Sequence, residues 1–356
     1  MLRNARILVT PLDWGLGHAT RCVPVIRALL SEGATPILGA DKGPLQLLRA
    51  EFPELEHVRI PGINIRYGSG SSQVWSMARQ FPAMLRSIRA EHAVFERLER
   101  DLRLHAVISD QRFGLHSDHL PCVLITHQVF PFTPLAQGAM RKVNLRHIGR
   151  FDRCWVMDEP TAPGLAGDLS HGPRMPANAR YIGAVSRFTI AKSRPTEAAC
   201  RIVAVISGPE PQRTQLEGLL LDQLHRIDGR HLLVQGLPAS PGERVAGNVR
   251  IVSHLPGEAL SAAMQHAELI VSRSGYTTLM DLAAIQRSAL IIPTPGQPEQ
   301  EYLGDLHART GRFLVQGQEA IDLAAALTWA PPKCAPLMEA PLLAQALKDL
   351  GDLLGR

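Results

Sequence analysis

Residues 268–278 read ELIVSRSGYTT, and this stretch decides the fold class. A short apolar run, Glu268–Ser272, passes through Arg273-Ser274-Gly275 into a segment whose Leu279 and Leu282 have helical spacing. A strand, a glycine turn and a helix in this order form the repeating unit of a parallel sheet covered by crossover helices. The unit recurs along the whole chain, so the sequence predicts an α/β protein built on doubly wound parallel sheets.

The predicted strands are short runs rich in Val and Ile, and amphipathic helical segments separate them. They form two sets of similar size, which predicts two Rossmann-like domains. The first set comprises residues 6–12, 35–40, 58–61, 105–110, 122–127, 154–158 and 181–185. The second set comprises residues 201–207, 231–235, 249–254, 268–272, 289–293 and 312–315.

The region between the two sets is typical of a domain boundary, because residues 159–193 are crowded with Pro and Gly. We therefore expect an N-terminal domain over residues 1–185 and a C-terminal domain over residues 186–335. Residues 336–356 have helical periodicity. They are expected to form a terminal helix, and one alternative is that this helix packs back on the N-terminal domain.

Composition bounds the class of protein. The 356 residues suffice for two domains that each bury a core, and the net charge of +5 favours an anionic partner. The Lys and Arg residues are dispersed and no nucleic-acid-binding motif occurs, so we expect no nucleic acid. The five cysteines form no CxxC pair, which argues against a zinc site or a disulfide scaffold. We see no signal peptide and no membrane span, and we expect a cytoplasmic protein.

A glycine loop follows the first predicted strand. Gly15 and Gly17 fit the start of a dinucleotide-binding fingerprint and Asp41 fits its acidic residue, but Thr20 stands where a third glycine is expected. A nicotinamide-dependent dehydrogenase therefore stays open as an alternative. Pro24 loses no helical hydrogen bond if the following helix begins close to Thr20, because the amides of a first turn are unpaired.

His18 is the residue of this loop best suited to catalysis. It lies at the carboxyl end of a parallel strand, where open α/β sheets bind ligands, and a histidine there can deprotonate a hydroxyl or water near neutral pH. The alternative is a histidine that only caps the local backbone. Asp13 either orients His18 or forms the turn.

Three loops of the C-terminal half leave strands of one sheet and can converge on one ligand. A diphosphate needs cationic groups and a helix N-terminus, and these loops supply both. Each loop alone could be only a helix cap. The expected binding residues are Ser207, Gly208, Arg213, Arg273, Ser274, Gly275, Tyr276, Thr277, Thr278, Asp281, Gln297 and Gln300, with Gly15 and Gly17 from the first loop.

These residues resemble the MurG-type glycosyltransferases of family 28. The most specific similarity runs from Glu268 to Tyr302, with matches at Arg273, Ser274, Gly275, Asp281 and Gln300. Three positions depart from the family pattern: the loop at 207–210, Glu301 and Gln128.

The resemblance implies a GT-B fold, with two Rossmann-like domains facing across a cleft. It implies an acceptor-side N-terminal domain and a C-terminal domain that binds a nucleotide sugar, most simply a UDP-linked one. Inverting transfer of a hexose or hexosamine to a glycan or lipid-linked acceptor in cell-envelope synthesis would follow. The acceptor-side residues implied are Thr20, Arg21, Asp110 and His127.

The segment Gly15 to Cys22 also resembles the nucleotide-sugar hydrolase of pseudaminic acid synthesis, in which the histidine would activate water. A hydrolase therefore remains an alternative, as does a non-catalytic sugar-nucleotide binder. No D-x-D pair occurs in the chain, so we predict no obligatory metal or other cofactor.

Residues 74–102 combine apolar residues with arginines. Such a helix either lies on an anionic membrane or packs on the sheet as a crossover helix. The first alternative would make the protein peripheral on the inner face of the cell membrane.

Overall fold

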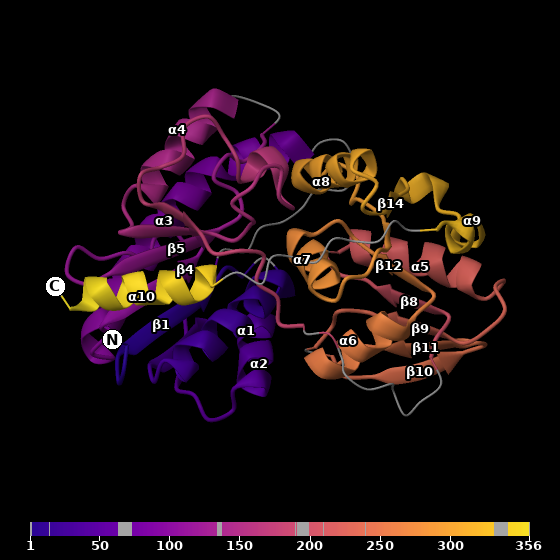
Figure 1. Ribbon diagram of the computed structural model, residues 1–356, viewed down its shortest axis with the longest axis horizontal. Helices are drawn as coiled ribbons and strands as arrows, with labels where there is room; N and C mark the ends of the chain where they lie inside the picture. The colour runs from indigo at the N-terminus through magenta and orange to yellow at the C-terminus, as the bar shows by residue number, and fades with distance from the viewer. Residues whose placement is uncertain are drawn as a thin grey trace. The chain divides into compact units, whose positions relative to one another are not determined.

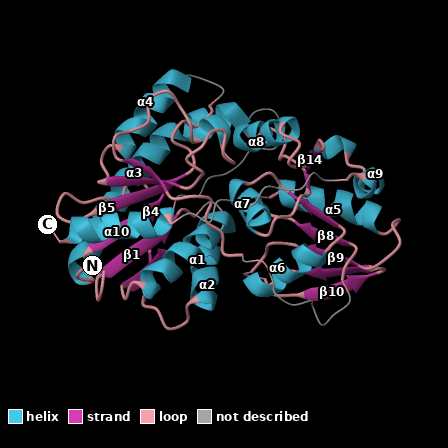
Figure 2. Ribbon diagram, viewed as in Figure 1, coloured by secondary structure: helices cyan, strands magenta, loops and turns pink. Residues whose placement is uncertain are grey.

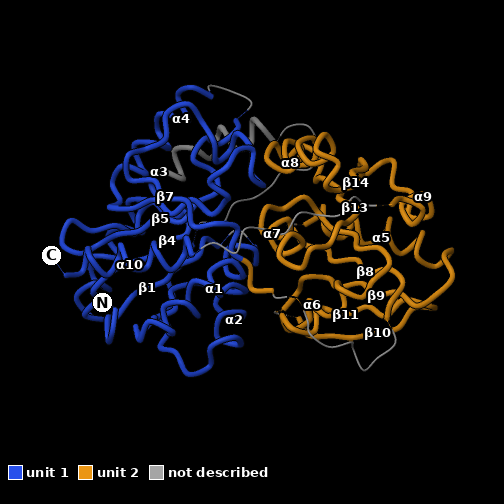
Figure 3. Tube along the Cα trace, in the orientation of Figure 1, with its two compact units in different colours: residues 1–66, 74–185, 338–356 blue, residues 67–73, 186–337 orange. Residues whose placement is uncertain are grey.

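The structure is a computed structural model that describes residues 2–13, 15–62, 73–133, 137–188, 190, 199–208, 210–238, 240–330 and 341–355. For residues 73–85 it describes the backbone alone. The chain divides into two compact units, which Figure 3 distinguishes by colour. The first unit contains the described parts of residues 1–66, 74–185 and 338–356, and the second contains those of residues 186–337.

The first unit is built on a parallel sheet in the order β3-β2-β1-β4-β5-β6-β7. The order reverses between β1 and β4, and ligands of open α/β sheets bind beside the carboxyl ends of strands at such a switch point. In β1, Ile7, Leu8 and Val9 are all fully buried, as expected for a sheet with both faces covered. The strands are β1 (Arg6–Pro11), β2 (Thr35–Ala40), β3 (His57–Arg59), β4 (Ala106–Asp110), β5 (Cys122–Thr126), β6 (Arg153–Val156) and β7 (Ala179–Tyr181).

Helices cover both faces of this sheet (Figures 1 and 2). The helix α1 begins at Leu16, directly after the turn at Gly15. The condition of a start close to Thr20 is therefore not met, and Pro24 lies inside α1. The helices are α1 (Leu16–Ser31), α2 (Lys42–Glu51), α3 (Gln73–Asp101), α4 (Gln137–Ile148), the 3-10 helix η1 (Gly167–Leu169) and α10 (Leu342–Leu354).

The helices α3 and α10 complete the first unit. In α3, Ile88 and Phe95 are buried, as a crossover helix requires. The apolar side chains between residues 74 and 85, on which the membrane alternative depends, lie outside the described residues. The helix α10 contacts α1, and its Asp349 forms an ion pair with Arg153 at the start of β6.

The second unit has a sheet in the order β10-β11-β9-β8-β12-β13-β14. All neighbouring strands are parallel except β10, which pairs with β11 in antiparallel register. The sequence analysis missed β10, because its largely exposed residues show no apolar run. The strands are β8 (Ile202–Val205), β9 (His231–Val234), β10 (Glu243–Ala246), β11 (Val249–Val252), β12 (Leu269–Ser272), β13 (Leu290–Ile291) and β14 (Leu314–Val315).

The core of the second unit lies between its sheet and its helices. Ile202, Val271 and Leu290, from three neighbouring strands, pack with Leu216 and Leu220 of α5. Each strand before a helix therefore ends at the same edge of the sheet, where its loop carries polar residues. The helices are α5 (Gln212–Leu224), α6 (Gly257–His266), α7 (Tyr276–Ala284), α8 (Pro298–Arg309), the 3-10 helix η2 (Gln318–Ala320) and α9 (Leu323–Thr328).

Candidate functional site

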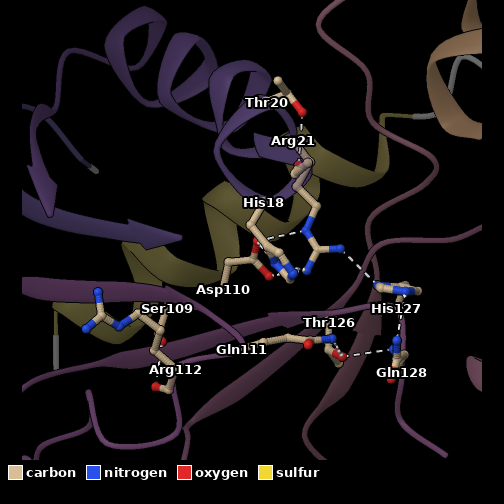
Figure 4. A network of polar contacts seen from close by, with 11 residues as sticks. His18, Thr20, Arg21, Ser109, Asp110, Gln111, Arg112, Thr126, His127 and Gln128 are labelled. Carbon is tan, nitrogen blue, oxygen red and sulfur yellow. Dashed lines mark hydrogen bonds and ion pairs between the residues drawn. The ribbon is translucent and has the colours of Figure 1, made fainter. Parts of the chain in front are cut away.

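A polar cluster lies at the switch point of the first unit, where β1 and β4 end (Figure 4). His18 and Arg21 lie one turn apart on α1, and Asp110 is the last residue of β4. The glycine before α1 makes this placement possible: Gly15 has a φ of 97°, which favours glycine, and α1 starts at the next residue. The two neighbouring strand ends thus bring together residues 92 positions apart in sequence.

Asp110 accepts hydrogen bonds from two directions. His18 Nδ1 lies 2.9 Å from Asp110 Oδ2. Arg21 Nε donates to the same oxygen at 2.7 Å, and Arg21 Nη2 donates to the other, Oδ1. Because a carboxylate can only accept, a proton on Nδ1 of His18 satisfies this contact and leaves the lone pair on Nε2. That tautomer is the one a general base needs.

Asp110 is fully buried. Burial by itself would raise its pKa, but the charges of Arg21 and His18 and their hydrogen bonds lower it to about 2. The carboxylate therefore stays ionised across the physiological range. Its charge and that of Arg21 form a buried pair, beside which the ring of His18 keeps about 15% of its surface exposed.

Arg21 also connects the cluster to β5. Its Nη1 donates to Nδ1 of His127 at 2.9 Å, while its Nη2 lies 2.9 Å from Nδ1 of His18. Thr20 donates to the carbonyl of Gly17 at 2.9 Å, within the first turn of α1. The four residues that we expected on the acceptor side, Thr20, Arg21, Asp110 and His127, are 7%, 2%, 0% and 3% exposed. Of these four, Asp110 and Arg21 contact His18, whose side chain is the more accessible at 15%.

Asp13 lies apart from this cluster. Its side chain packs so tightly against Gly62 that a Cβ there would come within 2.5 Å of it. Burial raises the pKa of Asp13, although the charge of Arg112 lowers it. Among the described residues, the carboxylate that contacts His18 is that of Asp110 and not that of Asp13. Asp110 therefore orients the histidine.

In the second unit, Arg273 follows β12 directly but is only 1% exposed. Its guanidinium group donates to protein atoms on three other segments, including the carbonyl of Gln212 at 2.9 Å and Oε1 of Gln318 at 2.7 Å. Burial lowers its pKa to about 10. The structure thus places this predicted diphosphate ligand beneath the loops rather than at their surface.

The helix α7 begins beside Arg273. Its N-cap residue is Gly275, and no side chain caps its first turn. The Ser274 hydroxyl donates to the carbonyl of Gln300 at 2.8 Å, which ties this turn to α8. Tyr276 is buried, whereas Thr277 and Thr278 are partly exposed at the start of the helix. This helix end carries the backbone N–H groups that the sequence analysis assigned to phosphate binding.

The loop before α8 is held by its own glutamines. Gln297 is the N-cap, and its Oε1 accepts from the backbone N–H of Gln300 at 2.5 Å. Gln300 Oε1 accepts from both the N–H and the hydroxyl of Thr294, which directs its NH₂ group away from them. Glu301, a departure from the family pattern, accepts from the N–H of Gly296 at 2.7 Å. It therefore has a structural partner within the loop.

Asp281 lies on α7, is 8% exposed, and accepts a hydrogen bond from the Ser186 hydroxyl at 2.5 Å. Burial raises its pKa to about 6, although the charge of Arg187 and the bond from Ser186 lower it. The carboxyl group therefore changes its protonation near neutral pH. No sequence pattern marks Ser186, 95 residues away, as its partner.

The loop after β8 contains Ser207 and Gly208, and Gly208 has a φ of 119°. Arg213, one residue into α5, donates to Glu210 at 2.7 Å and to Glu217 at 2.8 Å. Two carboxylates thus neutralise the cation that we expected to close over phosphates. Glu210 precedes Arg213 by three residues and Glu217 follows it by four. These spacings are typical of side-chain ion pairs along a helix, so the two pairs could have been predicted from the sequence.

The described residues contain neither a metal-binding cluster nor a membrane-spanning helix. No group of three or more His, Cys, Asp or Glu side chains is arranged there to hold a metal ion. Within the same residues, no helix is both long and apolar enough to cross a membrane.

Residues 250–310 match the family model described as the glycosyltransferase family 28 C-terminal domain. The matched residues are 61 of the chain's 356, so the similarity concerns this part of the second unit. The match covers β11 to α8 and so includes Arg273, α7 and the loop before α8. No curated protein sequence matches the chain.

Solved structures similar to this chain span it almost completely. SnogD from Streptomyces nogalater is 18% identical with a TM-score of 0.61, covering 99% of this chain and 96% of its own. The spinosyn rhamnosyltransferase SpnG, complexed with thymidine diphosphate, is 16% identical with a TM-score of 0.62, covering 98% and 96%. The calicheamicin glycosyltransferase CalG4 is 13% identical with a TM-score of 0.63, covering 99% of both chains. These similarities confirm the predicted GT-B fold.

Proposed function

We propose that this glycosyltransferase moves a hexose or hexosamine from a nucleotide sugar to a hydroxyl group of a glycan or lipid-linked acceptor, with inversion and without an obligatory metal ion. In this proposal the first unit supplies the base and the second unit holds the donor. The contact between Nδ1 of His18 and Oδ2 of Asp110, at 2.9 Å, is the observation that carries it. A histidine oriented by a buried, ionised carboxylate is equipped to remove a proton.

His18 acts as the base in the proposed step. Its Nε2 takes the proton of the acceptor hydroxyl, and Asp110 stabilises the imidazolium that forms. The acceptor oxygen bonds to the anomeric carbon while the bond from that carbon to the diphosphate breaks. The diphosphate leaves with the electron pair, on the face opposite the attack, so the anomeric configuration inverts.

The second unit stabilises the leaving group in this proposal. The N-terminus of α7 has no side-chain cap, and its N–H groups together with the hydroxyls of Thr277 and Thr278 suit a diphosphate. Ser274 and Gly275 form the turn before it, and Asp281 is assigned to the hydroxyls of the ribose. These donors and the charge of Arg273 take the part that a metal ion has in other transferases.

The nucleotide is proposed to be a pyrimidine nucleoside diphosphate. UDP follows from the resemblance to family 28, while SpnG is known in complex with thymidine diphosphate and VinC in complex with dTDP. We retain UDP as the first candidate and TDP as its competitor. A direct comparison of UDP- and TDP-linked sugars distinguishes them.

The test is turnover of UDP- and TDP-linked hexoses and hexosamines, with and without glycan or lipid extracts. We expect nucleotide release that depends on an acceptor, continues in EDTA, and yields a product of inverted configuration by NMR. Equally fast release without acceptor would make the protein a nucleotide-sugar hydrolase. Binding of a nicotinamide cofactor without binding of any nucleotide sugar would contradict both.

A role in cell-envelope synthesis on the inner membrane face belongs to the same proposal. It is supported by the net charge of +5, which favours an anionic surface. Sedimentation with anionic and with neutral liposomes is the test. We expect the protein to pellet with the anionic vesicles alone, and equal recovery in the supernatant of both would contradict membrane attachment.

A further inference from the structure

Arg273 makes an unusual set of contacts for a residue in a phosphate-binding motif. Nη2 donates to the carbonyl of Gln212 and to Oε1 of Gln318. Nη1 lies 3.3 Å from the carbonyl oxygens of both Ile292 and Pro293. Both terminal nitrogens of the guanidinium group are therefore committed to protein oxygens.

These contacts join segments that are distant in sequence. Gln212 begins α5 after the β8 loop, Ile292 and Pro293 follow β13, and Gln318 lies in η2 after β14. Together with β12, which precedes Arg273, four strand ends of the sheet meet at one side chain. The loops that the proposed function assigns to the donor are the loops that this side chain ties together.

Among the residues that the structure describes, none is a counter-ion to the charge of Arg273. All four acceptors are neutral, and within the described residues neither an ion pair to Arg273 nor a partner for its Nε is found. A buried cation without a carboxylate is costly to the folded protein. An anion bound above it, at the N-terminus of α7, would recover part of this cost without touching the guanidinium group.

We propose that Arg273 is a positioning residue of the donor site: it fixes the loops after β8, β13 and β14 around the N-terminus of α7 and does not itself contact the diphosphate. This inference rests on the proposed function, because it assumes that the second unit binds the donor. It assigns a role to Gln318 as well, since Gln318 holds the guanidinium group from the side of η2.

The experiment is the substitution Gln318→Leu, with Gln223→Leu as the matched control. Gln223 also ties a loop of this unit, through Ile321 and Leu323, but it does not contact Arg273. We measure the Kd of UDP and TDP by calorimetry, the KM and kcat for the preferred nucleotide sugar, and the Tm. Gln318→Leu should weaken nucleotide binding and raise KM about tenfold, the loss expected of a hydrogen bond to a charged group, with kcat within about twofold of wild type.

The controls separate positioning from stability. Gln223→Leu should lower the Tm and leave the Kd unchanged. Arg273→Lys keeps a charge but loses the planar fork, so it should weaken binding at least as much, and adding Gln318→Leu to it should have little further effect. Should the lysine variant fail to fold, the two glutamine variants still decide the question.

An unchanged nucleotide Kd in a folded Gln318→Leu variant would overturn the inference. So would a double variant in which Arg273→Lys and Gln318→Leu multiply each other's effects on the Kd. Either result would leave the proposed function intact. Failure of the wild-type protein to bind any nucleoside diphosphate would overturn the proposed function, and the positioning role with it.

Discussion

Asp110→Asn tests the buried carboxylate that contacts both His18 and Arg21. The substitution replaces a buried carboxylate with an amide of the same shape. At the place of Oδ2 the new NH₂ group faces both His18 and Nε of Arg21, whereas at the place of Oδ1 it faces Nη2 of Arg21 alone. The first orientation removes the acceptor that His18 now has. Facing a donor, His18 would adopt the tautomer with its proton on Nε2. It could then no longer take a proton from an acceptor.

The expected cost has a catalytic and a thermodynamic part. Loss of general base catalysis lowers kcat by about 10² to 10⁴. Removing one member of a buried ion pair costs about 3–5 kcal/mol of stability, because Arg21 remains charged and uncompensated. The shift of the Asp110 pKa from 3.8 to about 2 corresponds to about 2 kcal/mol, which is smaller because it omits the cost of leaving Arg21 unpaired.

The pH dependence has a defined sign. The pKa of Asp110 is lower in the folded than in the unfolded protein, so its stabilisation is present above about pH 4 and is lost as the pH falls toward 2. The stability difference between wild type and Asp110→Asn should therefore shrink over this window. Urea unfolding at pH 7 and pH 3, with kcat at saturating substrates at pH 7, measures both parts.

Asp118→Asn is the matched control, since Asp118 is an exposed aspartate that follows the same strand. It should leave kcat and stability unchanged. An Asp110→Asn variant that keeps wild-type kcat would refute the assignment of His18 and Asp110 as a catalytic pair. A stability difference that stays constant from pH 7 to pH 3 would refute the electrostatic account of the pair.

Three further predictions concern other buried groups. Burial raises the pKa of Asp281 to about 6, so the stability of the wild-type protein should fall as the pH rises from 4 to 6. The variant Asp281→Asn should have a higher Tm at pH 7 and bind UDP more weakly in calorimetry. Burial lowers the pKa of His116, so protonation of this residue at acid pH destabilises the folded protein relative to pH values above 6.5. In His116→Phe the Tm should therefore fall less between pH 7 and 5.5 than in the wild type. Glu91 accepts from Arg112 at 2.9 Å in the core of the first unit, and Glu91→Ala should lose about 3–5 kcal/mol in urea unfolding; a loss below 1 kcal/mol would contradict this.

Much of the fold could be predicted because the sheets are parallel. Runs such as Thr35–Ala40 are apolar on both faces, and the predicted and observed strands coincide there. The edge strand β10 was missed for the opposite reason, since it is exposed and carries Glu243 and Arg244. The start of α1 at Leu16 could not be read from Pro24, because the helix includes this proline.

The candidate site was predicted in its parts and less well in its contacts. The position of His18 after β1 follows from the strand, turn and helix pattern, which is local in sequence. Its partner Asp110 lies 92 residues away in sequence. The two residues meet because β1 and β4 are adjacent strands of the sheet. Arg273 and Gln318 present the same difficulty, because no sequence pattern marks a hydrogen bond across 45 residues.

The central claim is that His18 is the base of a glycosyl transfer. The most direct measurement compares kcat for acceptor-dependent nucleotide release in wild type, His18→Ala and the exposed control His119→Ala. The account predicts a fall in kcat of about 10² to 10⁴ for His18→Ala, with an unchanged Kd for the nucleotide, and wild-type behaviour for the control. A His18→Ala enzyme that transfers sugar at the wild-type rate would contradict it.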